Sequence, residues 1–287
     1  MILLIDADSL IFASCYRTKD EENQDPYYRD IEDSIAKFDE QYMKIVNDLE
    51  EDYEIEKVIT FNGSKGNFRK ILTPVYKANR KKQELPPLLH DMHQYVKDTF
   101  ESKFVYGLET DDLVAKYWQT LSNEFGRDNV MIVSIDKDYK QFPCLMYNYH
   151  YKHRVVLDIS EQEALYNFYE QMIVGDTADN VNYFKGKGKK FAERYYADCK
   201  TKYQYTKKLY ELFKEQYKGK ARQKYTECYK ERKSTRLNSS HSQQTPIPSS
   251  SRNRLITKSI KETNNRNTRQ KNLDMLSTRS TIIAKAI

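Results

Sequence analysis

The stretch Gly107-Leu108-Glu109-Thr110-Asp111-Asp112 places three carboxylates within four residues. The apolar residues that follow, from Leu113 to Leu121, recur at helical spacing and predict an amphipathic helix. Glu109 and Asp112 are three residues apart, so they share one face of its first turn. Acidic residues are common at a helix N-terminus because they interact favourably with the helix dipole. The stretch alone therefore fits either a capped helix start or part of a metal site.

Further acidic residues stand at predicted strand ends or in turns. In chain order they are Asp6 and Asp8, Asp136 and Asp138, and Asp176 and Asp179. Asp8 and Asp136 also fit as caps of the helices that follow them. Because open α/β sheets place ligands at the carboxyl ends of their strands, we expect the acids to converge. Bound cations would make so many like charges tolerable, and paired divalent metals on carboxylates hydrolyse phosphodiesters.

Apolar periodicity predicts an α/β fold. The expected strands are 2–5, 58–61, 130–135 and a pair within 145–157; the expected helices are 31–49, 88–104, the one after 112, 161–174 and one from about 190. Residues 18–30 are expected to form a loop. The pattern gives a central, mostly parallel sheet flanked by helices, followed by a helical region whose last part, 202–231, is rich in Tyr and Lys.

Basic residues gather in two places. The segment 67–82 is the densest basic stretch of the folded part and lies in a long loop after the second strand. A charge run is usually a solvated face, but long loops at such edges are usually functional, and Lys and Arg beside metal-bound carboxylates suit a phosphate clamp. The second place is Gly186-Lys187-Gly188, with further lysines around it, where a helix start exposes N–H groups to an anion. It suits a sugar-phosphate backbone read without sequence preference.

Composition sets the broad class. The 287 residues are 31% charged and 13% aromatic, with no apolar run long enough to span a membrane and no secretory signal at the N-terminus. The cysteines lack metal or redox spacing, which predicts reduced cytosolic thiols. They are Cys15, Cys144, Cys199 and Cys228.

Residues 232–287 differ from the rest. They hold 12 of the 48 Lys and Arg, 2 of the 42 Asp and Glu, and no Tyr or Phe. Such a segment cannot bury enough apolar surface to fold, so we expect disorder. A basic arm for nucleic acid is one interpretation. We prefer another, because Arg232 to His241 is similar to the in-frame translation of a sequencing-library adapter, which makes the tail an artefact.

Six motifs in order resemble those of the 5′-nuclease family: flap endonucleases, phage 5′→3′ exonucleases (some named phage ribonuclease H) and the 5′-nuclease domain of bacterial DNA polymerase I. They are Ile5-Asp6, Tyr76-Lys77-Ala78-Asn79-Arg80, Gly107 to Asp112, Ser134 to Asp138, Gly175 to Asn180, and Gly186 to Lys190. Each is weak alone, but six in this order and spacing are specific. The likeness spans about residues 2–215 and is greatest to the phage members.

The resemblance implies a PIN-like catalytic α/β domain at 1–158, with a basic arch region at about 62–85, and a helical DNA-binding region with a helix–three-turn–helix hairpin at 159–231. The first implied metal cluster is Asp6, Glu109, Asp111 and Asp112; the second is Asp136, Asp138, Asp176 and Asp179. Lys77 and Arg80 match arch residues that engage the scissile phosphate. The expected DNA contacts are Lys70, Lys77, Arg80, Lys185, Gly186, Gly188, Lys189 and Lys190, with a K⁺ ion at the hairpin.

Two departures from the family pattern matter. Asn62 stands where the family usually has an Asp after the second strand, and its carbonyl oxygen can ligate a metal without adding charge. Either the first metal binds more weakly or Asp8 compensates, so both residues are candidate ligands. Tyr183 and Lys187 stand where a Gly and an apolar residue are usual, which affects the ion site more than the phosphate contacts.

We therefore expect a hydrolase that uses two Mg²⁺ or Mn²⁺ ions: a 5′→3′ exonuclease or structure-specific flap endonuclease, with ribonuclease H activity as an option. It would act in phage-type DNA replication on DNA with 5′ ends, flaps or RNA primers, beside replication proteins, as a cytoplasmic monomer (in the host cell if viral) without a membrane partner. One alternative is a PIN-type ribonuclease, which would lack the glycine hairpin after Asp179. The other is a structure-specific DNA-binding protein with a weak or dead metal site, which only Asn62 supports.

Overall fold

The structure is a computed structural model that describes residues 1–17, 28–64, 66, 76–78, 85–150 and 152–233. Residues 231–233 are described by their backbone only. Most of the predicted loop at 18–30 lies outside the described residues. So do Lys70 and Arg80 of the predicted arch, and the tail from residue 234 onward. No described helix has the length and apolarity needed to cross a lipid bilayer.

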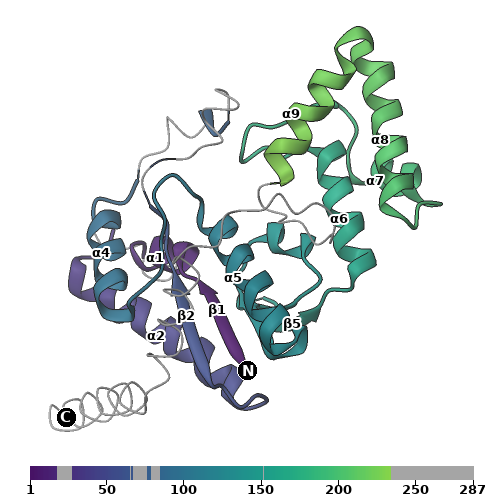
Figure 1. Cartoon of the computed structure of the whole chain (residues 1–287). Helices are drawn as coiled ribbons and strands as arrows, with labels where there is room; N and C mark the ends of the chain where they lie inside the picture. The colour runs from purple at the N-terminus through teal and green to yellow at the C-terminus, as the bar shows by residue number, and fades with distance from the viewer. Residues whose placement is uncertain (18–27, 65, 67–75, 79–84, 151, 234–287) are drawn as a thin grey trace, which may run out of the picture. The chain divides into compact units, whose positions relative to one another are not determined.

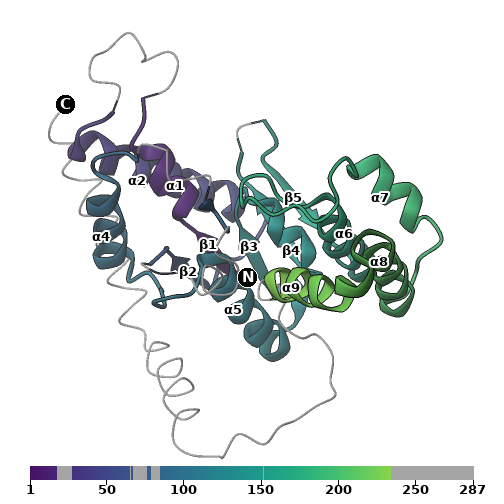
Figure 2. The same ribbon diagram turned by 90° about the horizontal axis from the view of Figure 1, so that it is seen from above.

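A five-stranded sheet carries the fold, in the order β2-β1-β3-β4-β5 (Figure 2). Its strands are β1 (Ile2–Asp6), β2 (Lys57–Phe61), β3 (Val130–Val133), β4 (Leu145–Asn148) and β5 (Val155–Asp158). The first four strands pair in parallel, and β5 is antiparallel to β4. The predicted mostly parallel sheet is confirmed, and the carboxyl ends of β1, β2 and β3 lie at one edge.

Helices cover both faces of the sheet (Figure 1). They are α1 (Asp8–Ser14), α2 (Ile31–Glu50), α4 (Leu89–Phe100), α5 (Thr110–Phe125), α6 (Glu161–Val174), α7 (Lys189–Tyr196), α8 (Lys202–Tyr217) and α9 (Ala221–Lys233), with 3-10 turns η3 (Arg127–Asn129), η4 (Lys137–Gln141) and η5 (Lys218–Lys220). Alternate residues of a strand face opposite sides. Leu4 therefore packs with α5 and η4, whereas Leu3 packs with α1, α2 and α4.

Two predicted elements end earlier than expected, and one predicted helical region is divided. The helix expected over 88–104 stops at Phe100, because Glu101 is left-handed (φ +47°) and the chain then runs beside β2, where the Lys103 N–H donates to the Thr60 carbonyl at 2.8 Å. The strand expected over 130–135 stops at Val133, because the Ser134 hydroxyl accepts the Asp136 N–H at 3.0 Å and turns the chain. The helical region expected over 202–231 consists of two helices, α8 and α9, separated by η5.

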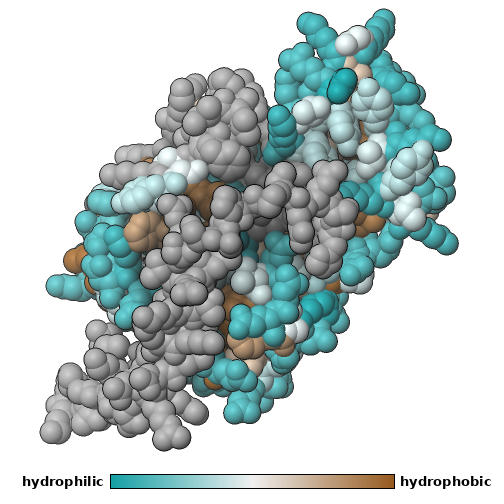
Figure 3. All heavy atoms as spheres, viewed as in Figure 1, coloured by the Kyte–Doolittle hydropathy of each residue, from teal (hydrophilic) through white to brown (hydrophobic). Residues whose placement is uncertain are grey.

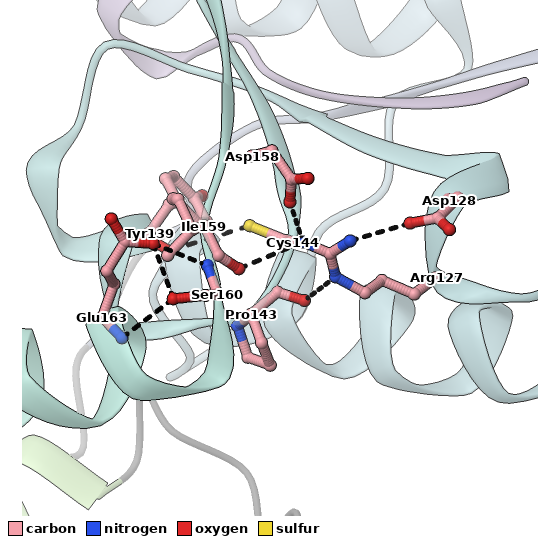
Figure 4. Close-up of polar contacts among 9 residues, drawn as sticks. All are labelled: Arg127, Asp128, Tyr139, Pro143, Cys144, Asp158, Ile159, Ser160 and Glu163. Carbon is pink, nitrogen blue, oxygen red and sulfur yellow. Dashed lines mark hydrogen bonds and ion pairs between the residues drawn. The ribbon is translucent and has the colours of Figure 1, made fainter. Parts of the chain in front are cut away.

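Arg127 fixes the junction between the sheet and α6 (Figure 4). Its guanidinium donates to the carbonyls of Pro143 (2.8 Å) and Ile159 (3.1 Å) and pairs with Asp158 at the end of β5. Ser160, which follows Ile159 in the chain, caps α6 in a capping box with Glu163. One side chain thus ties the end of α5, the start of β4 and the start of α6 together.

An aromatic core holds α6 to α9. Its largest fully buried members are Phe168, Tyr169, Phe184, Tyr196 and Phe213. Tyr169 stacks on Tyr205 with ring centroids 5.1 Å apart. All four cysteines of the chain are buried, and none forms a disulfide. The proposed division at residue 158/159 stays a prediction, although this aromatic core is separate from the two that flank the sheet.

Candidate metal centre

Asp6 ends β1 and is 7% exposed. Its carboxylate accepts the Tyr139 hydroxyl at 2.7 Å and the Asp8 N–H at 3.2 Å. Burial, followed by the negative charges of Asp8 and Asp136, raises the pKa of Asp6 to about 8. A carboxylate in such surroundings is costly to ionise unless a positive charge joins it.

The start of α5 carries Glu109, Asp111 and Asp112, which offer oxygen atoms within 4.8 Å of one another. Glu109 is the N-cap residue, but its side chain makes no capping hydrogen bond. The helix is held on the sheet by buried residues such as Val114 and Trp118. The start of α5 therefore gathers three carboxylates without using the N-cap side chain to close the helix.

Asp138, Asp176 and Asp179 form a second group within 4.8 Å. Asp176 Oδ1 accepts the N–H groups of Ala178 (2.8 Å) and Asp179 (3.3 Å), and the Asp176 backbone exchanges two hydrogen bonds with Val181. Gly175 precedes this turn at φ +74°, where an added Cβ would lie 2.3 Å from the Val181 carbonyl oxygen. The turn therefore requires glycine.

Asp136 interacts electrostatically with Asp138 and Asp179 of the second group and with Asp6. It caps η4 by accepting the Asp138 N–H at 2.9 Å, as the alternative capping interpretation of this residue expects. Burial, followed by the charges of Asp138 and Asp179, raises its pKa to about 6. Asp136 in turn raises the pKa of Asp6, and Tyr76 contacts a carboxylate of each group, so we call these carboxylates together the acidic centre.

Tyr76 and Lys77, from the predicted arch, join the two groups. The buried Tyr76 hydroxyl lies 2.8 Å from Glu109 Oε2 and 3.1 Å from Asp179 Oδ2. Lys77 Nζ pairs with Glu109 and lies 3.7 Å from Asp179 Oδ1. The backbone N–H of Lys77 donates to the Asp179 carbonyl at 2.8 Å. Lys77 thus lies between the acids it was expected to assist. The role of Tyr76 was missed, although its place among the basic residues was visible in the sequence.

Asp8 does not cap α1, contrary to the capping interpretation, because Ala7 is the N-cap residue. Its carboxylate instead accepts the Gly63 N–H and the Thr110 hydroxyl, both at 2.6 Å. It thereby links the ends of β1 and β2 to the start of α5. These contacts join positions up to 102 residues apart, so no local pattern could have predicted them.

Asn62 lies just after β2, as predicted, and is buried. Its Nδ2 donates to the His93 carbonyl of α4 at 3.0 Å, and its Oδ1 has no hydrogen-bond partner within the described part of the chain. The amide N–H thus turns to α4. Asp8 and Asn62 stay candidates as metal ligands, but each already serves the packing of this edge.

The predicted hairpin lies beyond the second group. Gly186 has φ +83° and Gly188 is the N-cap residue of α7. Lys185, Lys189 and Lys190 are exposed, whereas Lys187 lies over the Phe191 ring at 4.2 Å. The lysines expected to meet a phosphate backbone are therefore accessible.

The donor set fits hard divalent cations. Carboxylate oxygens are the ligands that Mg²⁺ and Mn²⁺ prefer. Two lysines bring positive charge to these carboxylates. Lys77 Nζ lies between Glu109 and Asp179, and Lys137 Nζ lies 2.9 Å from Asp176 Oδ2. Acids that recruit ammonium groups from both sides are chemically suited to hold cations.

The protein-family model for the 5′-3′ exonuclease N-terminal resolvase-like domain matches residues 1–169 of the chain. The chain belongs to this 5′-nuclease family. The match favours the 5′-nuclease prediction over the PIN-type ribonuclease. A search of the curated proteins finds no match.

Solved structures share the 5′-nuclease fold with this chain. The bacteriophage T5 D15 protein co-crystallised with metal ions has 17% identity and a TM-score of 0.55, covering 79% of this chain and 87% of that one. A complex of T5 D15 flap endonuclease with DNA and metal ions gives 18% identity and a TM-score of 0.55 over the same shares. T5 5′-exonuclease with bound zinc gives 19% and 0.54, over 80% and 85%. At these identities the likeness establishes the fold.

Proposed function

We propose that this 5′-nuclease is a divalent-metal-dependent 5′→3′ exonuclease and structure-specific flap endonuclease that hydrolyses phosphodiesters at DNA 5′ ends. The observation that carries the proposal is the convergence of two carboxylate groups, with Asp6 and Asp136, at the end of the sheet. The T5 relatives with this fold were crystallised with metal ions, and one with DNA.

The first group, with Asp6, would hold one Mg²⁺ or Mn²⁺, and the second group, with Asp136, would hold another. Two such ions supply an activated water and charge stabilisation for an in-line displacement. Lys77 offers an ammonium group at the junction of the groups and is suited to a phosphate oxygen. Tyr76 holds Glu109 and Asp179 in place through its hydroxyl.

The hairpin lysines Lys185, Lys189 and Lys190 would contact the duplex backbone, with K⁺ at the hairpin. We propose Lys70 and Arg80 as further DNA contacts; they lie outside the described residues. We also propose that the substrate includes flaps and RNA primers, with ribonuclease H activity on the latter. Phage-type DNA replication beside replication proteins, in the host-cell cytoplasm and as a monomer, completes this proposal.

Product mapping tests the reaction. The full chain is incubated with 5′-flap, nicked and RNA–DNA substrates labelled at both ends, with Mg²⁺ or with EDTA. We expect short products from the 5′ end with Mg²⁺ and none with EDTA. Cleavage that is equal in EDTA, or that starts at 3′ ends, would contradict the proposal.

Metal binding has a readout that does not depend on activity. Because bound cations relieve the repulsion among the carboxylates, Mg²⁺ should raise the melting temperature as its concentration exceeds the Kd. Asp111→Asn should reduce this rise, whereas Asp91→Asn, at an exposed position on α4, should leave it unchanged. An equal rise in both variants would place the ion elsewhere.

A further inference from the structure

A groove between α8 and α9 lies apart from the acidic centre in sequence. Its cavity volume is about 500 Å³. Aromatic and basic side chains dominate its lining, with Glu211 as the one carboxylate among the lining residues. The main lining residues are Tyr203, Lys207, Tyr210, Lys214, Arg222 and Tyr225. Over α8 and α9, Figure 3 shows a hydrophilic surface with paler patches.

Helix periodicity explains this composition. Tyr203, Lys207, Tyr210 and Lys214 follow one another at spacings of four, three and four residues, so they share one face of α8. The opposite face carries Tyr205, Leu209, Leu212 and Phe213, which are buried in the aromatic core. The aromatic core therefore does not include the groove face of α8, although Tyr210 on that face contacts Tyr225 of α9.

The groove is a basic region of an otherwise acidic folded chain. Residues 202–230 hold nine Lys and Arg against three Asp and Glu, whereas residues 1–231 as a whole hold 36 against 40. Two neighbouring lysines are neutralised, because Lys208 pairs with Asp198 and Lys224 with Glu227. Lys207, Lys214 and Arg222 are exposed and make no ion pair with any described residue. Of the seven cations that remain in this segment (9 − 2), three line the groove, against one carboxylate, Glu211.

The aromatic rings of the groove are partly open to solvent. Tyr203 is 74% exposed, which is unusual for a large aromatic side chain. Tyr210 meets Tyr225 edge to face, with centroids 5.5 Å apart, and Lys214 Nζ lies 5.6 Å from the Tyr210 ring. Aromatic faces beside cations that track a backbone are the combination that binds single strands without sequence preference.

We propose that the groove between α8 and α9 binds single-stranded nucleic acid, with phosphates on Lys207, Lys214 and Arg222 and a base stacked on Tyr203. A duplex would use the cations but could not present an unstacked base face to the ring. The site is separate from the acidic centre and the glycine hairpin, and its binding does not require that the centre cleave DNA.

The test uses the full chain in EDTA and a probe without a 5′ end. The probe is a fluorescein-labelled circular oligo(dT) of roughly 30 nucleotides, about twice the largest site size of one binding fold. Fluorescence anisotropy gives the Kd over a range of salt concentrations. The charge variant is Lys207→Gln with Lys214→Gln and Arg222→Gln. Its matched control neutralises three exposed lysines outside the groove, Lys44→Gln, Lys116→Gln and Lys230→Gln.

We expect the charge variant to weaken binding at low salt and to lower the slope of log Kd against log salt by about 2, because each single-strand phosphate contact contributes about 0.7. The control should keep the wild-type slope. Tyr203→Ala should weaken binding by about tenfold at every salt concentration, because stacking is not screened. Tyr203→Phe should bind like the wild type.

Three results would overturn the proposal. They are no binding of the circle by the wild type, equal losses in the charge variant and its control, and loss of duplex binding with circle binding unchanged. Circular dichroism checks that each variant is folded. Cleavage of a 5′-flap substrate by the wild type is measured separately, so failure of the groove and failure of the nuclease proposal give different results.

Discussion

The two carboxylate groups of the acidic centre are built by different means. Glu109, Asp111 and Asp112 stand at the start of a long helix, and their positions depend on the packing of α5 against the sheet. Asp138, Asp176 and Asp179 come from turns, and local N–H groups bind the Asp176 carboxylate. Similar donor sets therefore arise from tertiary packing in one case and from turn chemistry in the other. They should fail for different reasons when mutated.

The largest effect is expected from Asp111→Asn in the first group. Loss of one carboxylate should lower the cleavage rate at least about 100-fold. Changing a residue that only supports a metal ligand typically costs about 10- to 100-fold, and loss of a ligand itself should cost no less. DNA binding should stay within a few-fold, because phosphate contacts elsewhere dominate affinity. Single-turnover cleavage in Mg²⁺ and a binding assay in EDTA measure the two quantities. Wild-type cleavage would remove Asp111 from the metal site.

Gly175→Ala should break the second group through its backbone. The new Cβ would meet the Val181 carbonyl at 2.3 Å, and alanine at φ +74° is strained. We expect the free energy of unfolding, measured by urea titration, to fall by about 2–4 kcal/mol. Gly219→Ala, where nothing lies within 4 Å of the added Cβ, is the matched control. If both variants have the same urea midpoint, the turn does not constrain the second group.

Asn62→Asp tests whether the first group can accept another acid. The structure predicts that it cannot, since the new carboxylate would lose the hydrogen bond to the His93 carbonyl and be buried against it. The expected loss is about 2–3 kcal/mol of unfolding free energy. Asn47→Asp on α2, at an exposed position, is the control. A stable variant that needs less Mg²⁺ for half-maximal cleavage would instead show that position 62 faces the metals.

Tyr76→Phe removes the hydroxyl that the two groups share. Hydrogen bonds to charged groups contribute about 1.5–3 kcal/mol, so the metal-free protein should lose stability in that range. Tyr106→Phe, on a side chain that is 74% exposed, should be neutral. Equal urea midpoints for the two variants would mean that the groups hold their positions independently.

The smallest effect is expected outside both groups. Ending the chain after Lys233, the last residue of α9, should leave the melting temperature and the cleavage rate unchanged. The physical reason is that residues 234–287 contain no aromatic side chain. A loss of several degrees would show that the tail contributes to the fold.

Local patterns predicted the strands and the acids at their ends, because a buried parallel strand has an apolar sequence and a turn has its own residue types. β1 and β3 were therefore placed, together with Asp6 and Asp136. The contacts of Asp8, Tyr76 and Asn62 were not predicted, since each depends on a partner distant in sequence. The early end of α4 was missed for the same reason, because residues 101–103 leave the helix to run beside β2.

That last segment has a consequence for self-association. A sheet edge with unpaired N–H and C=O groups is a template for another chain. At the β2 edge, Lys103 exchanges hydrogen bonds with Thr60 and Asn62 (2.8 and 3.2 Å) and so blocks the end of the strand. At the other edge, β5 has only four residues, and Arg154, which precedes it, pairs with Asp48. Within the described residues neither edge offers a long flat strand, so we expect this sheet to resist edge-to-edge aggregation.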